Sequence, residues 1–148
     1  MIRVQTEDFD VGAEIAALTE GRHDIGAVVT FSGTVRDKTG DLVALELEHY
    51  PGMTEKELAR IEAEAHDRWP LEASLIVHRV GRLAPGENIV LVVTASAHRG
   101  AAFEAAEFLM DYLKTRAPFW KREETAGGGD WVDARDSDDQ AVERWKRD

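Results

Sequence analysis

The chain has 148 residues, of which 43% are hydrophobic, with 12 Gly and 4 Pro. This length and composition predict one ordinary domain with its own core and exclude collagen-like, low-complexity and wholly disordered classes. Lys and Arg number 18 against 29 Asp and Glu, and the net charge of -11 disfavours nonspecific binding to nucleic acid or an anionic membrane. Since cysteine is absent, a thiolate nucleophile, a persulfide carrier, a zinc–thiolate site and a disulfide are excluded within this chain.

The same sequence shows no sign of a membrane span or a secretion signal. No apolar run approaches the roughly 20 residues that a spanning helix needs. The first ten residues, MIRVQTEDFD, are acidic rather than basic, and no apolar segment follows them. We therefore expect a cytoplasmic protein that has neither nucleic acid nor membrane as a partner.

The first third of the chain predicts strand, helix and strand in turn. Residues 2–5 predict a short strand, and a helix follows from about Val11 to Thr19 with Asp10 as its N-cap. Residues 25–35 are rich in β-branched side chains and predict a second strand. Within it, Gly33 indicates a bulge or a close approach of another backbone.

The middle of the chain continues this alternation. Residues 42–50 predict a half-buried strand, because apolar side chains alternate in their second half. The segment Thr54–Glu57 has the pattern of a capping box and predicts the start of an amphipathic helix that ends at Pro70. Two further strands are predicted at 73–80 and 88–95, joined by a turn rich in Pro and Gly.

The last part predicts a helix from about residue 100 to 115 and short strands at 119–123 and 131–132. We expect residues 1–132 to form one α+β domain with a mixed or antiparallel sheet, because strands and helices are interleaved without a repeat. Residues 133–148 are highly charged and predict a mobile or partner-dependent tail.

Positive charge is concentrated in one segment of this acidic chain. Between His98 and Arg122 the charge is +2, against -13 for the rest, because five cations outnumber three carboxylates. The pair His98-Arg99 stands where an apolar strand leads into a helix start, a position that favours bound anions. The alternative is an ordinary solvated helix end.

Two lysines in this segment are candidates for chemistry. Lys114 follows an apolar residue near the helix end, and Lys121 follows the aromatic pair Phe119-Trp120. Apolar surroundings disfavour the charged form of a lysine, which lets it act as acid, base or amine nucleophile. The alternative is structural: Lys114 complements the helix C-terminus, and the Lys121 stem covers apolar surface.

The other motifs give weaker indications of function. The five histidines show no pair at metal-ligand spacing, and we predict no metal site; His49 and His78 lie inside strand patterns and are interpreted as structural. Residues 81–86 have the glycine spacing of a P-loop, but Glu87 stands where the phosphate-binding lysine is required. Arg36 follows a strand end, where a surface ion pair is the simplest interpretation.

Six blocks of the sequence nevertheless form a pattern together: Phe31–Arg36, Leu47–Met53, His78–Leu83, Gly86-Glu87, His98–Phe103 and Pro118–Glu123. In this order and spacing, the chain from about residue 2 to 132 resembles the MoaE family, the large catalytic subunits of molybdopterin synthase. The resemblance implies an α/β hammerhead-type fold and a homodimer of large subunits. It also implies a heterotetramer with a small ubiquitin-like sulfur carrier, whose C-terminal Gly-Gly bears a thiocarboxylate.

The activity that this resemblance implies is sulfur transfer. The family converts cyclic pyranopterin monophosphate to molybdopterin with two sulfurs from successive carriers, and the resemblance implies no cofactor or metal of the subunit's own. Both features agree with the residues: the sulfur arrives on a partner, and a phosphate ester needs a basic pocket. The alternative is a dimeric module that binds a phosphorylated small molecule or a ubiquitin-like partner without turnover.

The resemblance also implies roles for particular residues. Lys114 and Lys121 fall on the catalytic positions. With these two lysines, the substrate-binding positions are Thr34, Val35, Arg36, His98, Arg99, Arg122 and Glu123. We expect the side chains at 36, 98, 99, 114 and 121 to share one ligand, within a chain or across a dimer boundary.

Overall fold

The computed structural model of the chain describes residues 1–132 and 136–146. Within them, the elements in chain order are β1 (Ile2–Gln5), α1 (Val11–Thr19), β2 (Ala27–Thr34), β3 (Leu42–His49), α2 (Met53–Arg68), β4 (Leu71–Arg79), β5 (Gly81–Leu83), β6 (Asn88–Ser96), α3 (Arg99–Thr115), β7 (Phe119–Thr125), β8 (Gly128–Val132) and α4 (Asp136–Glu143). None of the described helices is long and apolar enough to cross a lipid bilayer.

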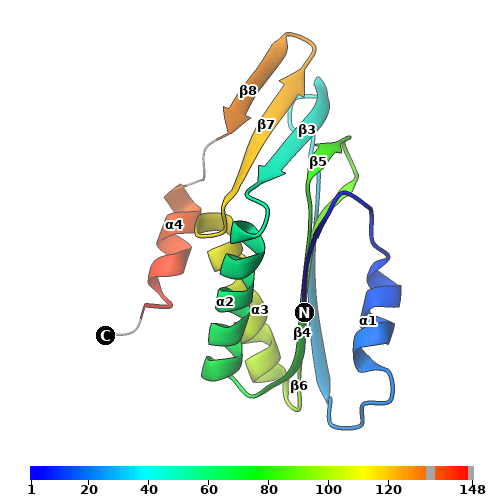
Figure 1. Cartoon of the computed structure of the whole chain (residues 1–148), viewed down its shortest axis with the longest axis vertical. Coiled ribbons are helices and arrows are strands. Elements are labelled where there is room, and N and C mark those ends of the chain that lie inside the picture. The colour runs from blue at the N-terminus through cyan, green and yellow to red at the C-terminus, as the bar shows by residue number, and fades with distance from the viewer. Residues whose placement is uncertain (133–135, 147–148) are drawn as a thin grey trace.

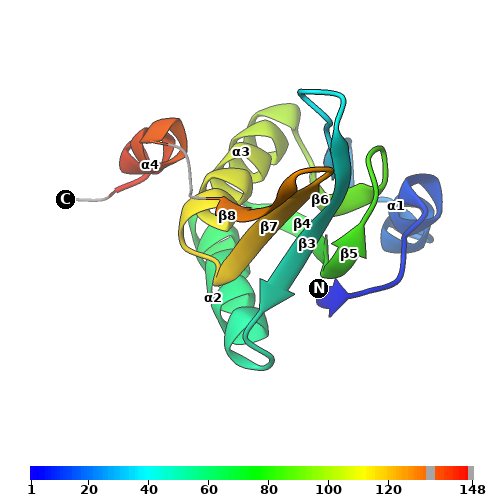
Figure 2. The same cartoon turned by 90° about the horizontal axis from the view of Figure 1, so that it is seen from above.

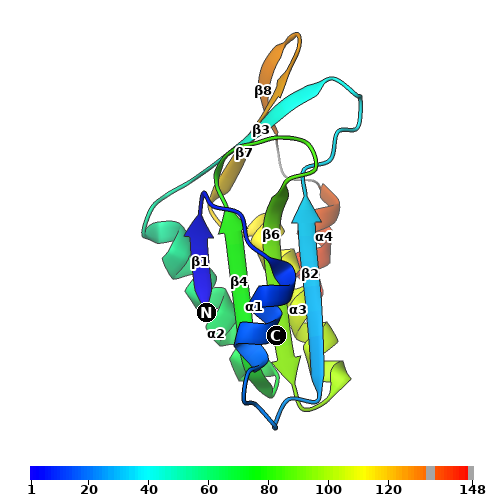
Figure 3. The ribbon, with the colours of Figure 1, turned by 90° about the vertical axis from the view of Figure 1, so that its right-hand side faces the viewer.

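The strands form two four-stranded sheets. The first, sheet A, has the order β1-β4-β6-β2, in which β1 pairs with β4 in parallel and the other pairs are antiparallel (Figure 3). The second, sheet B, has the order β5-β3-β7-β8 and is antiparallel throughout. Sheet B rises beyond one end of sheet A (Figure 1). The predicted α+β class with mixed and antiparallel pairing is thus confirmed.

The core follows from the alternation of side chains along the central strands. On β4, Ile76 belongs to the cluster that contains Phe108 of α3, whereas its neighbour Leu75 belongs to the cluster that contacts Ile15 of α1. Helices α2 and α3 therefore cover one face of sheet A and α1 covers the other (Figure 1). With both faces covered, β4 and β6 read as nearly continuous apolar runs.

Two local predictions are confirmed in detail. Helix α1 has the predicted bounds, and the Asp10 carboxylate accepts a hydrogen bond from the Ala13 backbone N–H at 2.8 Å. The pairing of β2 with β6 shifts register between Gly33 and Thr34, and a Cβ on Gly33 would lie 2.9 Å from Cγ1 of Val90. Gly33 therefore marks the predicted bulge, and the close approach is made by a side chain rather than by another backbone.

The predicted start of α2 is wrong by two residues. The helix begins at Met53 with Gly52 as its N-cap, and Glu55, not Glu57, reaches back to accept from the Gly52 backbone N–H. Thr54 does not cap the helix because its hydroxyl has other partners: it accepts from the Tyr50 N–H at 3.0 Å and donates to the Pro118 carbonyl at 3.1 Å. This buried hydroxyl ties the end of β3 to the start of β7.

Strand β5 lies within a segment predicted as a turn. Its three residues pair with β3, Leu45 opposite Leu83, and Leu83 is fully buried. Three residues are too short to show an alternation in the sequence.

Of the two alternatives for the predicted tail, mobile or partner-dependent, the mobile one is wrong for residues 136–146. Helix α4 packs along α3 on the side away from α1 (Figure 2), with Val142 buried and the Arg144 guanidinium 2.6 Å from the Asp111 carboxylate. The Trp145 ring makes edge contacts with Trp69 and Phe108, with centroids 5.5 and 5.6 Å apart. Residues 133–135 and 147–148, also part of the predicted tail, lie outside the described residues.

We expect Thr54→Val to lower the free energy of unfolding by about 2 to 3 kcal/mol, because it leaves the part-buried Tyr50 N–H and Pro118 carbonyl without their shared partner. Urea denaturation measures the change. Thr125→Val is the matched control, since its hydroxyl makes one exposed bond to the Gly128 carbonyl, and its loss should cost under about 1 kcal/mol. Equal losses in the two variants would contradict the bridging role of Thr54.

Candidate functional site

A cavity of about 530 Å³ lies where sheet B meets sheet A. The end of β2, the strands β3 and β7 and the last turns of α3 enclose it. The lining side chains and backbone come from Phe31, Gly33, Thr34, Val35, Arg36, Lys38, Leu42, Leu45, Leu47, His78, Ile89, Val90, Met110, Leu113, Lys114, Ala117, Phe119, Trp120, Lys121, Glu123, Val132 and Asp138. Apolar walls with a few charged groups are typical of a small-molecule site.

The charged groups of this cavity are mainly positive. Four cations, Arg36, Lys38, Lys114 and Lys121, stand against the two carboxylates of Glu123 and Asp138. In a chain with a net charge of -11, this is a local reversal of sign. Guanidinium and ammonium groups that converge on one space bind phosphate and other anions.

The position of Arg36 depends on the backbone of the preceding residue. Val35 is buried, and its N–H donates to the Glu87 carbonyl at 2.9 Å while its carbonyl accepts from the Gly86 N–H at 2.8 Å. The turn between β5 and β6 therefore holds the end of β2 on both sides. Arg36 leaves this fixed point at the edge of the cavity.

Strand β7 supplies Lys121 and Glu123 by simple alternation. They pair in register with Leu47 and Leu45 of β3, two buried residues that also line the cavity. Arg122 lies between them in sequence and so points to the opposite face of sheet B.

Arg122, predicted as a substrate-binding residue, therefore does not line this cavity. Its guanidinium lies across Gly129 of β8, where a Cβ would come within 2.9 Å of Nε. The alternation at Lys121, Arg122 and Glu123 explains this placement, since successive side chains of a regular strand point to opposite faces.

His98 and Arg99 also lie outside the cavity of a single chain. Both are exposed at the N-terminus of α3, whereas Lys114 stands near its C-terminus. The helix advances about 1.5 Å per residue, so Arg99 and Lys114 are separated by about 22 Å along its axis. The structure thus brings together Thr34, Val35, Arg36, Lys114, Lys121 and Glu123 of the predicted residues, and it leaves His98, Arg99 and Arg122 elsewhere.

Three titratable residues of the cavity were not among the predicted site residues. Lys38 stands two positions after Arg36, and this spacing was its only signal. His78 was interpreted as a structural histidine within a strand. Asp138 belongs to α4, in the segment predicted as a tail, and no sequence motif pointed to it.

His78 is the buried titratable group of the cavity wall. Its ring stacks on Phe119 with centroids 3.8 Å apart and planes at 17°, and Nδ1 lies 2.8 Å from the Arg79 carbonyl oxygen. Burial is the main cause that lowers the pKa of His78 to about 4, against the opposing hydrogen bond to Arg79. The positive charges of Lys114 and Lys121 lower it further. The ring is neutral at pH 7.

The second hollow and the acidic and histidine side chains give no further candidate site. A second hollow of about 380 Å³ is lined by Met53, Lys56, Glu57, Arg60, Arg116 and Pro118, and it contains none of the predicted site residues. Within residues 1–132 and 136–146, no group of three or more His, Asp or Glu side chains could hold a metal ion.

The fold and the cavity together define a class of protein: an α+β domain of two sheets with a cationic ligand cavity at their junction. The family model described as MoaE protein matches residues 4–116. A molybdopterin synthase catalytic subunit from Mesorhizobium japonicum is 65% identical over 147 residues, covering 98% of this chain and 92% of that protein. The chain belongs to the MoaE family.

Solved structures agree with this assignment. The molybdopterin biosynthesis MoaE protein from Burkholderia ambifaria superposes with a TM-score of 0.85 at 59% identity, covering 98% of this chain and 97% of that one. A protein complex of subunits 1 and 2 of molybdopterin-converting factor from Helicobacter pylori shares the fold, with a TM-score of 0.77 at 20% identity and coverage of 90% and 91%.

We expect the chain to lose stability in acid through His78. Above pH 6.5, both folded and unfolded chains hold this ring neutral, and its full contribution is present. Between pH 6.5 and about 4, only the unfolded chain binds the proton, so the contribution is lost as the pH falls. The loss amounts to about 3 kcal/mol over this range.

Urea denaturation at pH 7.5 and 4.5 measures this loss in the parent chain and in His78→Gln. The variant should lose less stability between the two pH values, by about 2 to 3 kcal/mol. His23→Gln, at an exposed histidine, is the control and should follow the parent chain. A His78→Gln profile that coincides with the parent would show that His78 does not carry this dependence.

Proposed function

We propose that this chain is the catalytic subunit of a molybdopterin synthase, a sulfurtransferase that converts cyclic pyranopterin monophosphate to molybdopterin. Membership of the MoaE family and the names of its close relatives support the activity. The observation that carries the proposal is the convergence of Arg36, Lys114 and Lys121 on one cavity in a chain without cysteine. The cavity supplies positive charge, and a partner supplies the sulfur.

We assign the roles within the cavity from their charge and position. Arg36 binds the phosphate, because a guanidinium matches two phosphate oxygens. Lys114 and Lys121 stabilise the charge that develops when the carrier thiocarboxylate attacks the pterin and the cyclic phosphate opens, and they transfer protons. No nucleophile of this chain is needed.

We propose that the sulfur carrier is a small ubiquitin-like subunit whose C-terminal Gly-Gly enters the cavity. The Helicobacter pylori structure of the same fold contains two subunits of molybdopterin-converting factor, which supports a two-subunit enzyme. Beside the cavity, the Tyr50 ring is exposed and meets Trp120 edge-on at 4.7 Å. An extended peptide can pair with a strand edge near these rings.

We further propose a homodimer in which β2 pairs with its copy. Strand β2 is one of the two edge strands of sheet A (Figure 3), and it exposes Val28 and Phe31. A free edge with exposed apolar side chains favours pairing with another strand, and two-fold symmetry makes the pairing antiparallel.

This pairing would complete the site. Ala27 lies beside Ser96, two residues before His98, whereas Thr34 lies at the cavity. Strand β2 spans about 23 Å and α3 about 24 Å, so an antiparallel copy brings the partner's α3 N-terminus toward this cavity. His98 and Arg99 would then serve the site of the other subunit, and the complete enzyme would be a heterotetramer with two carriers.

The binding module without turnover is not favoured, since the close relative is named a catalytic subunit and both lysines line the cavity. The cytoplasm remains the location that we propose for this enzyme.

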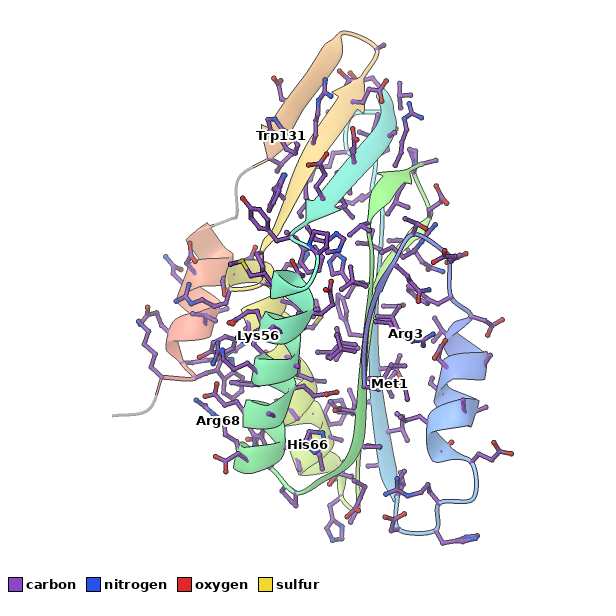
Figure 4. All side chains as sticks on the ribbon, in the orientation of Figure 1. Met1, Arg3, Lys56, His66, Arg68 and Trp131 are labelled. Carbon is purple, nitrogen blue, oxygen red and sulfur yellow. The ribbon has the colours of Figure 1, made fainter. Side chains whose placement is uncertain are left out.

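Incubation of the chain with thiocarboxylated carrier and cyclic pyranopterin monophosphate should yield a product with two added sulfurs, detected by mass spectrometry. Lys114→Ala should slow its formation by at least 100-fold, the scale of about 3 to 4 kcal/mol for a lost preorganised charge. Lys56→Ala, at an exposed lysine of the first turn of α2 (Figure 4), is the control and should retain activity. Near-normal turnover by a folded Lys114→Ala variant would refute its catalytic role.

Mixing two inactive variants tests the shared site. If His98 serves the partner's cavity, a dimer of one Lys114→Ala chain and one His98→Ala chain has one intact site and one site with both defects. When equal amounts of the two variants exchange subunits at random, half of the dimers are mixed and each has one intact site of two. The mixture should therefore regain about one quarter of the parent activity. If each site is built within one chain, every site in the mixture carries a defect, and no activity returns.

A further inference from the structure

His78 has no role in the mechanism above, although it forms part of the cavity wall. It stands at the end of β4, paired with Val4 of β1 and Val90 of β6, and only 9% of it is exposed. The ring cannot swing away, because Phe119 stacks on one face and the Arg79 carbonyl holds Nδ1. A polar ring fixed this firmly beside a ligand cavity is a candidate for recognition.

The contact with Arg79 determines which ring nitrogen carries the proton. A carbonyl oxygen can only accept, so Nδ1, 2.8 Å away, must be the donor. A neutral imidazole has one N–H, which leaves Nε2 with a lone pair. Among the described residues, the buried side-chain nitrogens without a partner are Nε of Arg3 and Nε of Arg68, so Nε2 of His78 is not sealed in the core. His78 lines the cavity, and Nε2 is its ring nitrogen that can accept a hydrogen bond.

The surroundings of the ring keep it neutral. Lys114 from α3, Lys121 from β7 and His49 from β3 act on it electrostatically, and each of them disfavours a positive charge on the ring. The neighbours in sheet A, Val4 and Val90, are apolar. None of these groups favours the protonated form of the ring, so Nε2 keeps its lone pair at neutral pH.

This acceptor is uncharged and held in place, which distinguishes it from the charged groups of the cavity and from the rotatable Thr34 hydroxyl. Arg36, Lys38, Lys114 and Lys121 can only donate, and Glu123 and Asp138 are charged acceptors. The cations suit a phosphate but make no distinction among the molecules that carry one. An uncharged acceptor at a fixed position suits an N–H group of a neutral heterocycle, and it leaves an analogue without that N–H unpaired.

We propose that His78 determines specificity: its Nε2 accepts a hydrogen bond from a ring N–H of the bound pterin, while the cations hold the phosphate. This inference rests on the proposed function, since it takes the pterin as the ligand. His78 orients the heterocycle and takes no part in bond formation.

Three variants separate the two nitrogens of the ring. His78→Asn keeps a donor near Nδ1 but has no group at Nε2, His78→Gln keeps an acceptor near Nε2, and His78→Phe keeps only the stacking on Phe119. Calorimetry measures the Kd of each for cyclic pyranopterin monophosphate and for inorganic phosphate. We expect His78→Asn and His78→Phe to weaken pterin binding at least tenfold, His78→Gln to weaken it less than threefold, and phosphate binding to stay within twofold in all three.

Nitrogen NMR of the parent chain provides a test without a variant. With 15N-labelled histidine at pH 7, His78 should show a protonated Nδ1 and an unprotonated Nε2, and the Nε2 resonance should shift when the pterin is added but not with phosphate alone. The opposite tautomer, or an unmoved Nε2 resonance in the pterin complex, would overturn the inference.

The outcomes also distinguish this inference from the proposed function. If the parent chain transfers two sulfurs and His78→Asn binds the pterin normally, the role of His78 is wrong and the function stands. If the variants lose affinity for phosphate and for the pterin to the same extent, His78 only maintains the shape of the cavity, and the specificity role is again wrong. If the parent chain binds no pterin, both proposals fail.

Discussion

The site depends on how sheet B is held against the end of sheet A. Two contacts fix this junction: the stacking of Phe119 on His78 and the bridge of the Thr54 hydroxyl to Pro118. Both fix the start of β7, which then carries Lys121 past the end of α3, where Lys114 stands. Because the cavity is built from two sheets and a helix end, a small change at the junction moves its cations relative to one another.

Bringing four cations together has an energetic cost. Like charges that converge in a partly enclosed space repel one another, and Glu123 and Asp138 offset only part of that repulsion. The rest of the protein carries excess negative charge, which favours solubility and disfavours unspecific binding of polyanions. An excess of positive charge in the lining therefore favours an anionic ligand, such as a phosphate ester.

Much of the fold could be predicted because its signals are local. Asp10 caps a helix in the way its chemistry dictates, and Gly33 stands where a neighbouring side chain leaves no room for a Cβ. Thr54 misled the prediction for the opposite reason. Its sequence pattern is that of a cap, but its hydroxyl is engaged 64 residues away along the chain, and no local rule anticipates that partner.

In the site, too, local features could be predicted from the sequence, whereas contacts between distant segments could not. Residue types marked Lys114 and Lys121 as candidates, and the family resemblance added Arg36 and Glu123. Strand alternation could have placed Arg122 on the other face. The distance between Arg99 and Lys114 follows from helix length, but which subunit each serves depends on a surface between chains. His78 was interpreted as structural because a histidine inside an apolar strand gives no sign that one of its atoms reaches a cavity.

The residues of the cavity wall come from two separate parts of the sequence, and the last of them is Asp138 of helix α4. The family model ends at residue 116, yet Lys121, Glu123, Val132 and Asp138 of the wall all follow it. Sheet A, the helices that cover it and part of the wall are therefore specified by one stretch of sequence. Strands β7 and β8 and the remaining charges are specified by another. Substitutions in the final stretch change the electrostatic balance of the cavity without disturbing the buried strands β4 and β6. The charge that Asp138 adds to the cavity can thus change while the two core layers stay as they are.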